Sequence, residues 1–354
     1  MAGKNGLIVI TGCSGRIGLR LIEQLKENYQ IVGFDVVPPK KFSESVDFQR
    51  IDLSSDASVK EGFTYIAGKY GKHIDAFIHL AAYYSFSKGE PEKYDNITVR
   101  GTGRLIENLQ SFICEQFIFS STQLVQKTCE PGEKVNENSP LDAKWDYPRS
   151  KIETEKLLHE KRGNIPVVIL RIAGCYDDQC SSIPISNQIQ RIYEKQLIAH
   201  LFPGDTSHGQ PFLHFDDLID AFLLCVNKRK ELPPEVTLLI GEGKTYGYGE
   251  IDNAISVELF GKEISHIRIP KWFAKIGAWT QNHAPFMEKS FVQPWMVDLA
   301  DDNCAIDITK AKTVLGWVPK HDVLATIPKM IAFLKKDPEG FYALNGLKYP
   351  CAKK

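Results

Sequence analysis

The sequence lacks the features that would mark a membrane, secreted or polyanion-binding protein. No apolar run approaches the ~20 residues that a membrane-spanning helix needs, and the first residues lead into an apolar segment without a signal-peptide pattern. The eight cysteines are scattered, with no C-x-x-C pair and no His/Cys spacing typical of a metal site. A formal net charge of −1 gives no general attraction to phosphate backbones. We therefore expect a cytoplasmic protein with reduced thiols, no metal, no membrane partner and no nucleic-acid partner.

The composition is that of an ordinary globular protein. Its 354 residues are 43% hydrophobic and 25% charged, enough to bury a large core in one domain, with or without an added lobe. The first half alternates short, β-branched apolar runs with longer helical stretches, which is typical of a parallel sheet with crossover helices. The runs are apolar throughout, as in strands buried on both faces. The expected strands are Leu7–Thr11, Gln30–Phe34, Phe48–Ile51, Ala76–Leu80, Phe117–Ser120 and Val167–Leu170.

A glycine-rich turn follows the first expected strand. Gly12, Gly15 and Gly18 stand between that strand and an apolar helical stretch. Glycine lets the backbone turn sharply and approach a pyrophosphate, and the N-terminus of the helix offers unpaired N–H groups to the anion. The alternative is a tight strand–helix turn that binds no ligand. We expect a cofactor phosphate at this loop, bound by Gly12, Ser14, Gly15, Arg16, Ile17 and Gly18.

An aspartate ends the second expected strand. Asp35 lies 17 residues beyond Gly18, where a carboxylate hydrogen-bonds the adenosine ribose of a dinucleotide. A carboxylate there repels a 2′-phosphate, so NAD is favoured over NADP, although Arg16 is a nearby cation that would favour NADP. We therefore expect residues 1–173 to form an NAD-binding Rossmann domain, whose core continues around 203–242.

The pattern loosens in the second half of the chain. Segments rich in Pro, Gly, Asp and Ser, at 177–184 and 202–211, alternate with expected helices near 217–228 and 249–260. This is the pattern of insertions that follow the later strands of a sheet, so we expect residues 174–354 to form mainly a substrate-binding lobe. The predicted fold class is α/β: a Rossmann-type, doubly wound parallel sheet with a smaller C-terminal α/β substrate lobe.

A tyrosine and a lysine share one face of a later expected helix. Tyr147 and Lys151 are i and i+4, and Pro148 suits the first turn of a helix. A free tyrosine has a pKa near 10 and is a poor base at neutral pH. A lysine ammonium and the positive nicotinamide ring of oxidised NAD both favour the phenolate. The pair is then able to remove a hydroxyl proton while hydride leaves the same carbon. The alternative for Y-x-x-x-K is a solvated helix face.

Hydroxyl side chains end the fifth expected strand. Ser120, Ser121 and Thr122 follow three apolar residues, and a hydroxyl there can hold the reacting oxygen of a substrate. In this order, the glycine turn, Asp35, Ser-Ser-Thr and Tyr-x-x-x-Lys resemble the extended short-chain dehydrogenase/reductase superfamily. More narrowly, the chain resembles the NAD-dependent epimerase/dehydratase family that acts on nucleotide sugars. The resemblance runs from residue 7 to about 335, and its further matches are Asp52-Leu53, His79–Ala82, Val99–Thr102, Leu170-Arg171, Phe212–Asp217 and Asp307–Pro319.

The resemblance implies a role for each matching position. Tyr147 would be the base, Lys151 its activator and the anchor of the cofactor ribose, and Thr122 the hydroxyl partner, with Ser121 as the reserve candidate. Further cofactor-binding residues would be Asp52, Leu53, Leu80, Ala81, Ala82 and Lys151. Substrate-binding residues would be Tyr83, Tyr84, Thr122, Tyr147 and Cys175. In relatives, the helix carrying V-x-G-T and the helix carrying the tyrosine pack against their copies, which implies a homodimer.

The sequence departs from the family pattern at two places that bear on the reaction. Gln123 and Leu124 replace the Asp-Glu pair of members that dehydrate nucleotide sugars, and neither side chain transfers protons, so dehydration is disfavoured. The segment His208–Pro211 lacks the arginine that often grips the diphosphate. We expect an enzyme acting on a carbohydrate, with a nucleotide-sugar epimerase using transient hydride transfer as the first choice. The alternatives are an NAD-dependent dehydrogenase of a free sugar or sugar acid, similar to the uronate-dehydrogenase branch, and a non-catalytic NAD-binding regulator.

Two further features are open. His214 is expected to be a structural, hydrogen-bonding histidine, and His79 to line the cofactor floor. An aromatic-rich stretch is interpreted as a lid, an oligomer surface or simply core; it contains Trp272, Trp279, Phe286, Phe291 and Trp295.

Overall fold

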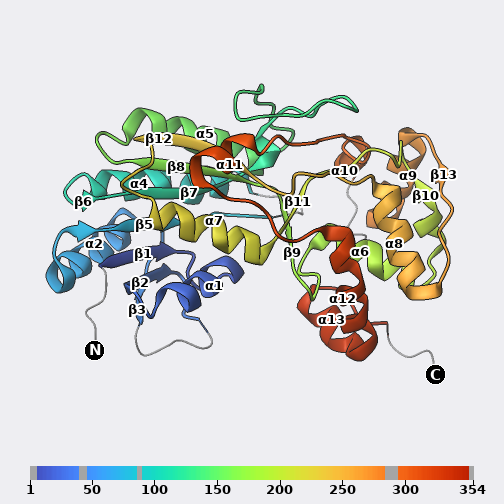
Figure 1. The fold of residues 1–354 in the computed structure, drawn as a ribbon, viewed down its shortest axis with the longest axis horizontal. Coiled ribbons are helices and arrows are strands. Elements are labelled where there is room, and N and C mark those ends of the chain that lie inside the picture. Colours follow the sequence, from blue (N-terminus) through green and yellow to red (C-terminus); the bar gives the residue numbers. More distant parts are fainter. Residues whose placement is uncertain (1–5, 40–45, 86–89, 284–293, 351–354) are drawn as a thin grey trace.

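A parallel sheet of seven strands forms the centre of the molecule in the computed structural model, which describes residues 6–39, 46–85, 90–283 and 294–350 (Figure 1). The strand order is β12-β8-β7-β5-β1-β2-β3. It reverses between β1 and β5, the switch point where ligands bind beyond the carboxyl ends of the strands. The predicted α/β Rossmann fold is confirmed. The bounds are β1 Leu7–Thr11, β2 Gln30–Asp35, β3 Val46–Arg50, β5 Ala76–His79, β7 Phe117–Thr122, β8 Val167–Ile172 and β12 Glu235–Ile240.

Side chains on both faces of the sheet are buried, as the continuous apolar runs predict. In β1, Ile8 and Ile10 belong to one core cluster, whereas Leu7 and Val9 belong to another on the opposite face. The first cluster is covered by α1 (Arg16–Leu25), α7 (Phe215–Asn227) and α11 (Thr309–Leu315). The second is covered by α2 (Asp56–Tyr70), α4 (Arg100–Leu109) and α5 (Asp146–Lys161). This is the doubly wound arrangement.

Strand β12 was not predicted as a strand. It pairs in parallel with β8, from Glu235 opposite Val167 to Ile240 opposite Ile172. The short run follows Pro233-Pro234 and begins Glu-Val-Thr, so its apolar pattern is weaker than that of the other central strands. The helix expected to carry Val99–Thr102 is preceded by α3 (Pro91–Lys93) and a π-helical stretch (Tyr94–Val99), and α4 begins at Arg100.

A smaller lobe lies beyond the carboxyl ends of the strands (Figure 1). A third core cluster holds it together, with side chains from α6, α8, α12 and α13. Its helices are α6 Ile183–Tyr193, α8 Tyr248–Phe260, α9 Lys271–His283, α10 Pro294–Asp298, α12 Val323–Lys336 and α13 Pro338–Leu344. Among the described residues, six short strands lie outside the central sheet and pair in twos: β4 His73–Ile74 with β6 Ile113–Cys114, β9 Gly174–Tyr176 with β11 Phe212–His214, and β10 Leu201–Phe202 with β13 Ile267–Arg268. Two 3₁₀ turns cover Gln123–Val125 and Leu197–His200.

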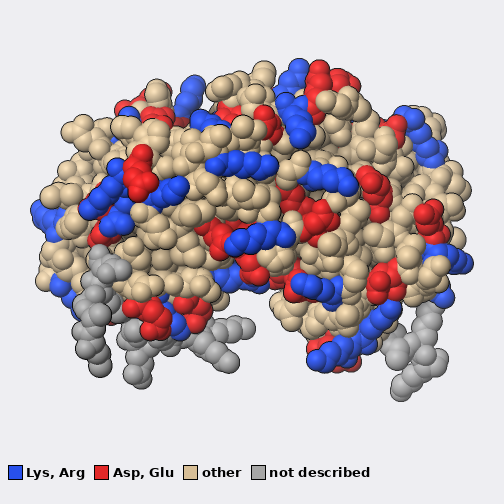
Figure 2. Space-filling model, viewed as in Figure 1, with Lys and Arg blue, Asp and Glu red and all other residues tan. Residues whose placement is uncertain are grey.

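Surface charge is mixed on the face shown in Figure 2, where lysine and arginine are interspersed with aspartate and glutamate. In the described part of the chain, every helix is too short or too polar to cross a membrane.

Candidate active site

A cavity of about 1600 Å³ lies between the carboxyl end of the sheet and the C-terminal lobe. The glycine loop, the end of β7, the start of α5 and the helices α6, α9 and α10 contribute to its walls. Twelve of the predicted site residues line it: Gly12, Gly15, Arg16, Ile17, Gly18, Leu80, Ala82, Tyr84, Thr122, Tyr147, Lys151 and Cys175. The topology therefore brings the two strongest sequence motifs to one place.

The glycine loop fits a pyrophosphate. Gly12 has φ +69°, and a Cβ there would lie 2.9 Å from the backbone N of Ala81, so a larger residue would be strained and crowded. A Cβ at Gly18 would lie 2.5 Å from the carbonyl oxygen of Gly12. Helix α1 begins directly behind Gly15 without a side-chain cap. Its first N–H groups are therefore available to an anion in the cavity.

Asp35 is fixed at the end of β2 by the neighbouring backbone. Its carboxylate accepts hydrogen bonds from the backbone N–H of Ser14 (3.0 Å) and of Val36 (2.8 Å). Arg16, the cation that would favour NADP, instead donates to the carbonyl oxygens of Ser181 (3.1 Å) and Leu344 (2.7 Å) in the lobe. The charges beside the loop therefore suit the free ribose hydroxyls of NAD.

The tyrosine and lysine predicted to be catalytic lie together, with Lys151 buried and Tyr147 half-buried. Lys151 Nζ donates to the carbonyl oxygen of Ser120 (2.7 Å) and lies 5.8 Å from the ring centroid of Tyr147. Burial lowers the pKa of Lys151 to about 7 and raises the pKa of Tyr147. The phenol is thus protonated until positive charge is brought to the site, and oxidised NAD carries such a charge.

The two hydroxyls at the end of β7 have different partners. Ser121 Oγ donates to Glu155, whose carboxylate forms a buried ion pair with Arg171 (2.7 Å). Thr122 Oγ1 accepts from the backbone N–H of Leu124 (3.3 Å), and Ser121 and Thr122 both line the cavity. Because the proton of Ser121 is already committed to Glu155, the geometry favours Thr122 as the donor to a substrate oxygen.

Aromatic rings surround Tyr147. Tyr84 and Trp145 have ring centroids 4.7 Å and 5.6 Å from that of Tyr147, and both line the cavity. Trp145 is not among the residues predicted from the sequence, although it stands only two residues before Tyr147. Tyr83, predicted to bind substrate, is not among the lining residues and packs instead on Tyr94, with centroids 4.7 Å apart.

Several matches to the family pattern act within the core. His79 is fully buried between the hydroxyls of Thr11 (Nδ1, 2.6 Å) and Thr102 (Nε2, 2.9 Å). Burial lowers its pKa to about 3, so the ring is neutral and joins β1 and β5 to α4. Leu53 is likewise a buried core residue, whereas Asp52 is exposed and its carboxylate accepts from the N–H and the hydroxyl of Ser54 (2.8 and 2.7 Å).

Helix α9 has two different faces. Phe273 and Ala278 line the cavity, whereas Trp272 and Trp279 are 64% and 57% exposed on the outside. The aromatic-rich stretch is therefore part cavity wall and part surface. Phe286, Phe291 and the side chain of Trp295 lie outside the described residues.

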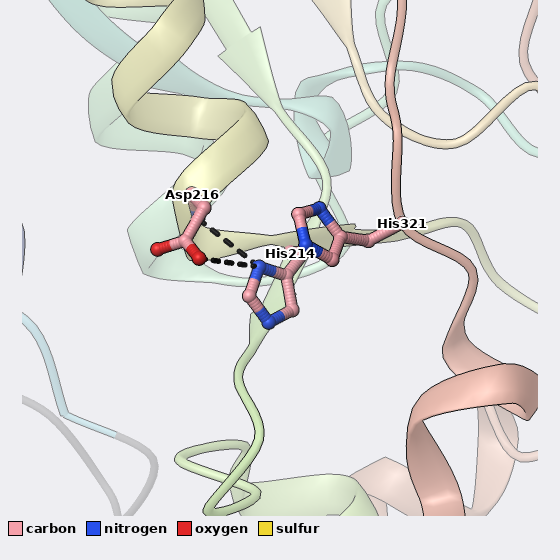
Figure 3. A group of neighbouring side chains, drawn as sticks. All are labelled: His214, Asp216 and His321. Carbon is pink, nitrogen blue, oxygen red and sulfur yellow. Dashed lines mark hydrogen bonds and ion pairs between the residues drawn. The ribbon is translucent and has the colours of Figure 1, made fainter.

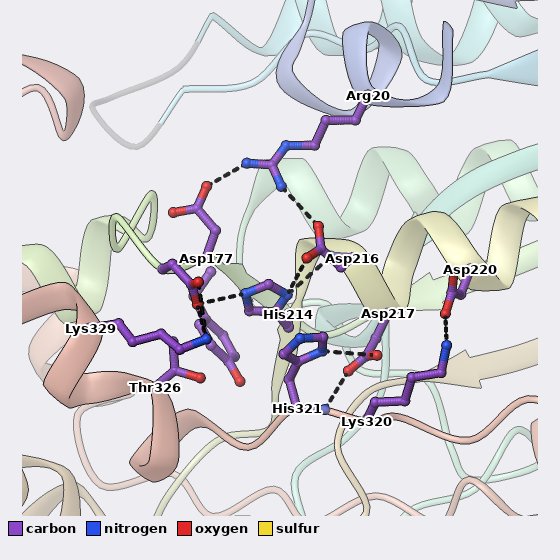
Figure 4. A network of polar contacts seen from close by, with 12 residues as sticks. Arg20, Asp177, His214, Asp216, Asp217, Asp220, Lys320, His321, Thr326 and Lys329 are labelled. Atoms are coloured by element: carbon purple, nitrogen blue, oxygen red, sulfur yellow. Dashed lines mark hydrogen bonds and ion pairs between the residues drawn. The ribbon is translucent and has the colours of Figure 1, made fainter. Parts of the chain in front are cut away.

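A second polar cluster joins the sheet to the lobe. His214, Asp216 and His321 bring potential ligand atoms within 4.8 Å of one another (Figure 3). The two imidazole rings are stacked, with centroids 3.9 Å apart and an interplanar angle of 16°. Parallel stacked rings cannot both direct an in-plane nitrogen at one metal ion, and His214 Nδ1 already accepts from the N–H of Asp216 (3.2 Å). In Figure 4, Arg20 of α1 extends this network to Asp177 and Asp216, so the cluster is a structural connection.

Known proteins resemble this chain over nearly its whole length. Residues 8–241 match the NAD dependent epimerase/dehydratase family. A putative UDP-glucose 4-epimerase of Methanocaldococcus jannaschii is 24% identical over 94% of this chain and 99% of its own. A sterol-4-alpha-carboxylate 3-dehydrogenase of Candida albicans is 23% identical over 93% and 98%. The structure of UDP-glucuronic acid 4-epimerase from Bacillus cereus, solved with UDP-glucuronic acid and NAD, aligns with a TM-score of 0.70 at 21% identity, covering 93% and 99%.

The family match covers more than half of the chain, from the first strand of the central sheet to the last. It confirms the resemblance drawn from the motifs, the expected NAD cofactor and the expectation of an enzyme of the extended short-chain dehydrogenase/reductase type. The chain belongs to the NAD dependent epimerase/dehydratase family.

Proposed function

We propose that this chain is a nucleotide-sugar epimerase that oxidises one sugar hydroxyl transiently and reduces the resulting ketone from the opposite face. The observation that carries the proposal is the placement of Tyr147, Lys151 and Thr122 on one cavity with the glycine loop. The names of the relatives support the substrate class. The position after Thr122 favours epimerisation over dehydration, because Gln123 cannot transfer protons and its amide donates to Cys304 Sγ (2.7 Å).

Different residues of the chain bind the cofactor, orient the substrate and transfer the proton. Bound NAD supplies the hydride acceptor, with Gly12, Gly15 and Gly18 at its pyrophosphate and Asp35 at its ribose. Thr122 donates a hydrogen bond to the substrate oxygen and orients it. Tyr147 removes the hydroxyl proton and returns it after the sugar has rotated. Lys151 stabilises the phenolate electrostatically and binds the nicotinamide ribose.

The test is product analysis after incubation with UDP-glucose or UDP-glucuronate and NAD. The expected result is the 4-epimer of one of these sugars without accumulation of NADH, because the hydride is returned. Tyr147→Phe serves as the control that removes chemistry. Absence of epimer from a panel of UDP-hexoses, with NADH accumulating from a free sugar, would replace this proposal by the dehydrogenase alternative.

A dehydrogenase is the second candidate, and the cavity gives it a specific support. The wall that the C-terminal lobe contributes is largely apolar, and His208–Pro211 supplies no arginine. Such a wall suits the apolar body of a substrate other than a sugar, so it supports an NAD-dependent dehydrogenase but not the free-sugar or sugar-acid substrate expected from the sequence. Apolar residues on this wall include Ile198, Phe273, Ala278, Met296, Val297 and Leu299. The third alternative, a non-catalytic regulator, leaves the Tyr147–Lys151 pair without a use.

We also propose a cytoplasmic homodimer in which α4 and α5 pack against their copies. The seven cysteines in the described ranges are free thiols, which suits a reducing compartment. Helices α4 and α5 contact each other, so together they offer one continuous surface for a two-fold interface. Light scattering at micromolar concentration should give twice the chain mass of 39.9 kDa. A mass near 40 kDa would exclude the dimer.

We propose, finally, that residues 1–173, with core segments around 203–242, form the cofactor domain and that 174–354 form mainly the substrate lobe. The pairing of β12 with β8 supports this division, because it returns the chain to the sheet.

A further inference from the structure

The cavity has three basic side chains among its lining residues: Arg16, Lys151 and Arg191. Arg16 is occupied by two carbonyl oxygens, and Lys151 donates to Ser120 beside the catalytic tyrosine. Arg191 stands on α6, in the wall formed by the lobe. Of the described residues that line the cavity, it is the cation placed to meet the part of a substrate remote from the reacting hydroxyl.

The hydrogen bonds around Arg191 leave most of its donors free. Its Nη1 donates to Gln188 Oε1 at 3.4 Å, which is a long bond. Gln188 in turn donates to Asp252 Oδ2 (2.7 Å), and the same oxygen accepts from His266 Nε2 (2.9 Å). Within the described part of the chain, no carboxylate oxygen lies within 4.0 Å of Arg191. The neighbours orient the guanidinium without neutralising it.

A half-buried guanidinium in this state favours an oxyanion. It has five N–H donors in a planar fork, and removing them from bulk water without acceptors is costly. A phosphate or carboxylate accepts two parallel bonds from the fork, which gives both affinity and orientation. Burial also lowers the pKa of Arg191, and the charge of Asp252 opposes this shift.

We propose that Arg191 binds the anionic group of the substrate, a diphosphate or a carboxylate, and that Gln188 positions the guanidinium of Arg191. The inference rests on the proposed function, because it concerns the same cavity. Arg191 then takes the place of the arginine that the segment His208–Pro211 lacks. The site selects substrates that carry an oxyanion on the lobe side of the reacting sugar.

The test separates binding from turnover. Protein saturated with NAD is titrated calorimetrically with UDP, with inorganic diphosphate and with D-glucuronate, for wild type, Arg191→Gln and Arg191→Lys. The matched control is Arg268→Gln, an exposed arginine of the same lobe that does not line the cavity. We expect Arg191→Gln to weaken the anion that binds by about 10- to 100-fold. Arg191→Lys should recover part of this affinity, and Arg268→Gln and NAD binding should be unchanged.

The outcomes decide the source of the anion and the fate of the proposal. A loss confined to UDP and diphosphate assigns a phosphoryl group, and a loss confined to glucuronate assigns a carboxylate. Equal affinities in wild type and Arg191→Gln, or no binding of any of the three probes by wild type, overturn the anion site. UDP binding that depends on Arg191, without epimerisation of any UDP-hexose, refutes the proposed reaction and leaves the site standing. If Arg191→Gln epimerises a UDP-hexose with an unchanged KM, the proposed reaction is retained and the anion site at Arg191 is refuted.

Discussion

Replacing Tyr147 with phenylalanine removes one oxygen from the cavity and nothing else. The ring keeps its neighbours Tyr84 and Trp145, at 4.7 and 5.6 Å between centroids, so the fold and the NAD site should be retained. Loss of a general base lowers a rate by ~10²–10⁴-fold. This corresponds to about 3–5 kcal/mol of added activation free energy, at 1.36 kcal/mol per tenfold.

Two measurements on this variant separate chemistry from binding. NAD affinity, followed by quenching of tryptophan fluorescence, should stay within a few-fold of wild type, while epimer formation from the accepted sugar falls by the full factor. Tyr83→Phe is the matched control, because that tyrosine packs on Tyr94 and does not line the cavity. Its turnover should be near wild type. Turnover by Tyr147→Phe within a few-fold of wild type would show that another group is the base.

The remaining predictions concern the neighbouring groups. Thr122→Ala should slow turnover more than Ser121→Ala, because the Ser121 hydroxyl is held by Glu155; steady-state kinetics giving the opposite order would transfer the role to Ser121. Asp35→Ala should weaken NAD more than NADP in binding titrations, and tighter NADP binding by wild type would contradict this. The pKa of Lys151 is lowered to about 7 by burial, so the unfolded chain binds more protons above pH 7. The unfolding free energy of cofactor-free wild type, relative to Lys151→Met, should therefore rise from pH 7 to 10 in urea titrations; a flat difference would rule out a neutral buried lysine.

The central strands and the glycine turn could be predicted because each is specified by residues that are neighbours in the sequence. The central strands are continuous apolar runs because helices cover both of their faces. The glycine turn is recognisable because glycine is needed where the backbone approaches a pyrophosphate closely. The choice between Ser121 and Thr122 was of another kind. Ser121 and Thr122 both line the cavity, and they differ in that the Ser121 hydroxyl donates to Glu155 on α5, a contact between distant segments that the local sequence does not show.

Residues whose role depends on the lobe were not predictable in this way. Arg191 stands on a helix of ordinary composition, and it meets the cavity only because the lobe packs against the sheet. The stacked rings of His214 and His321 likewise join positions more than 100 residues apart. The sequence predicts the helix or loop that carries each such residue, but it does not predict which helices and loops pack against one another.

The late position of β12 in the chain has a consequence for biosynthesis. Until Ile240 has left the ribosome, β8 has no partner along one side, and its six residues present unpaired N–H and C=O groups. The lobe segments between β8 and β12 emerge in the meantime and cannot complete their own packing. A nascent chain of this protein therefore exposes an aggregation-prone, unpaired strand edge for the time needed to synthesise some 70 residues, from 172 to 240. Ribosome-associated chaperones should bind it in that interval, and a fragment ending at residue 173 should aggregate.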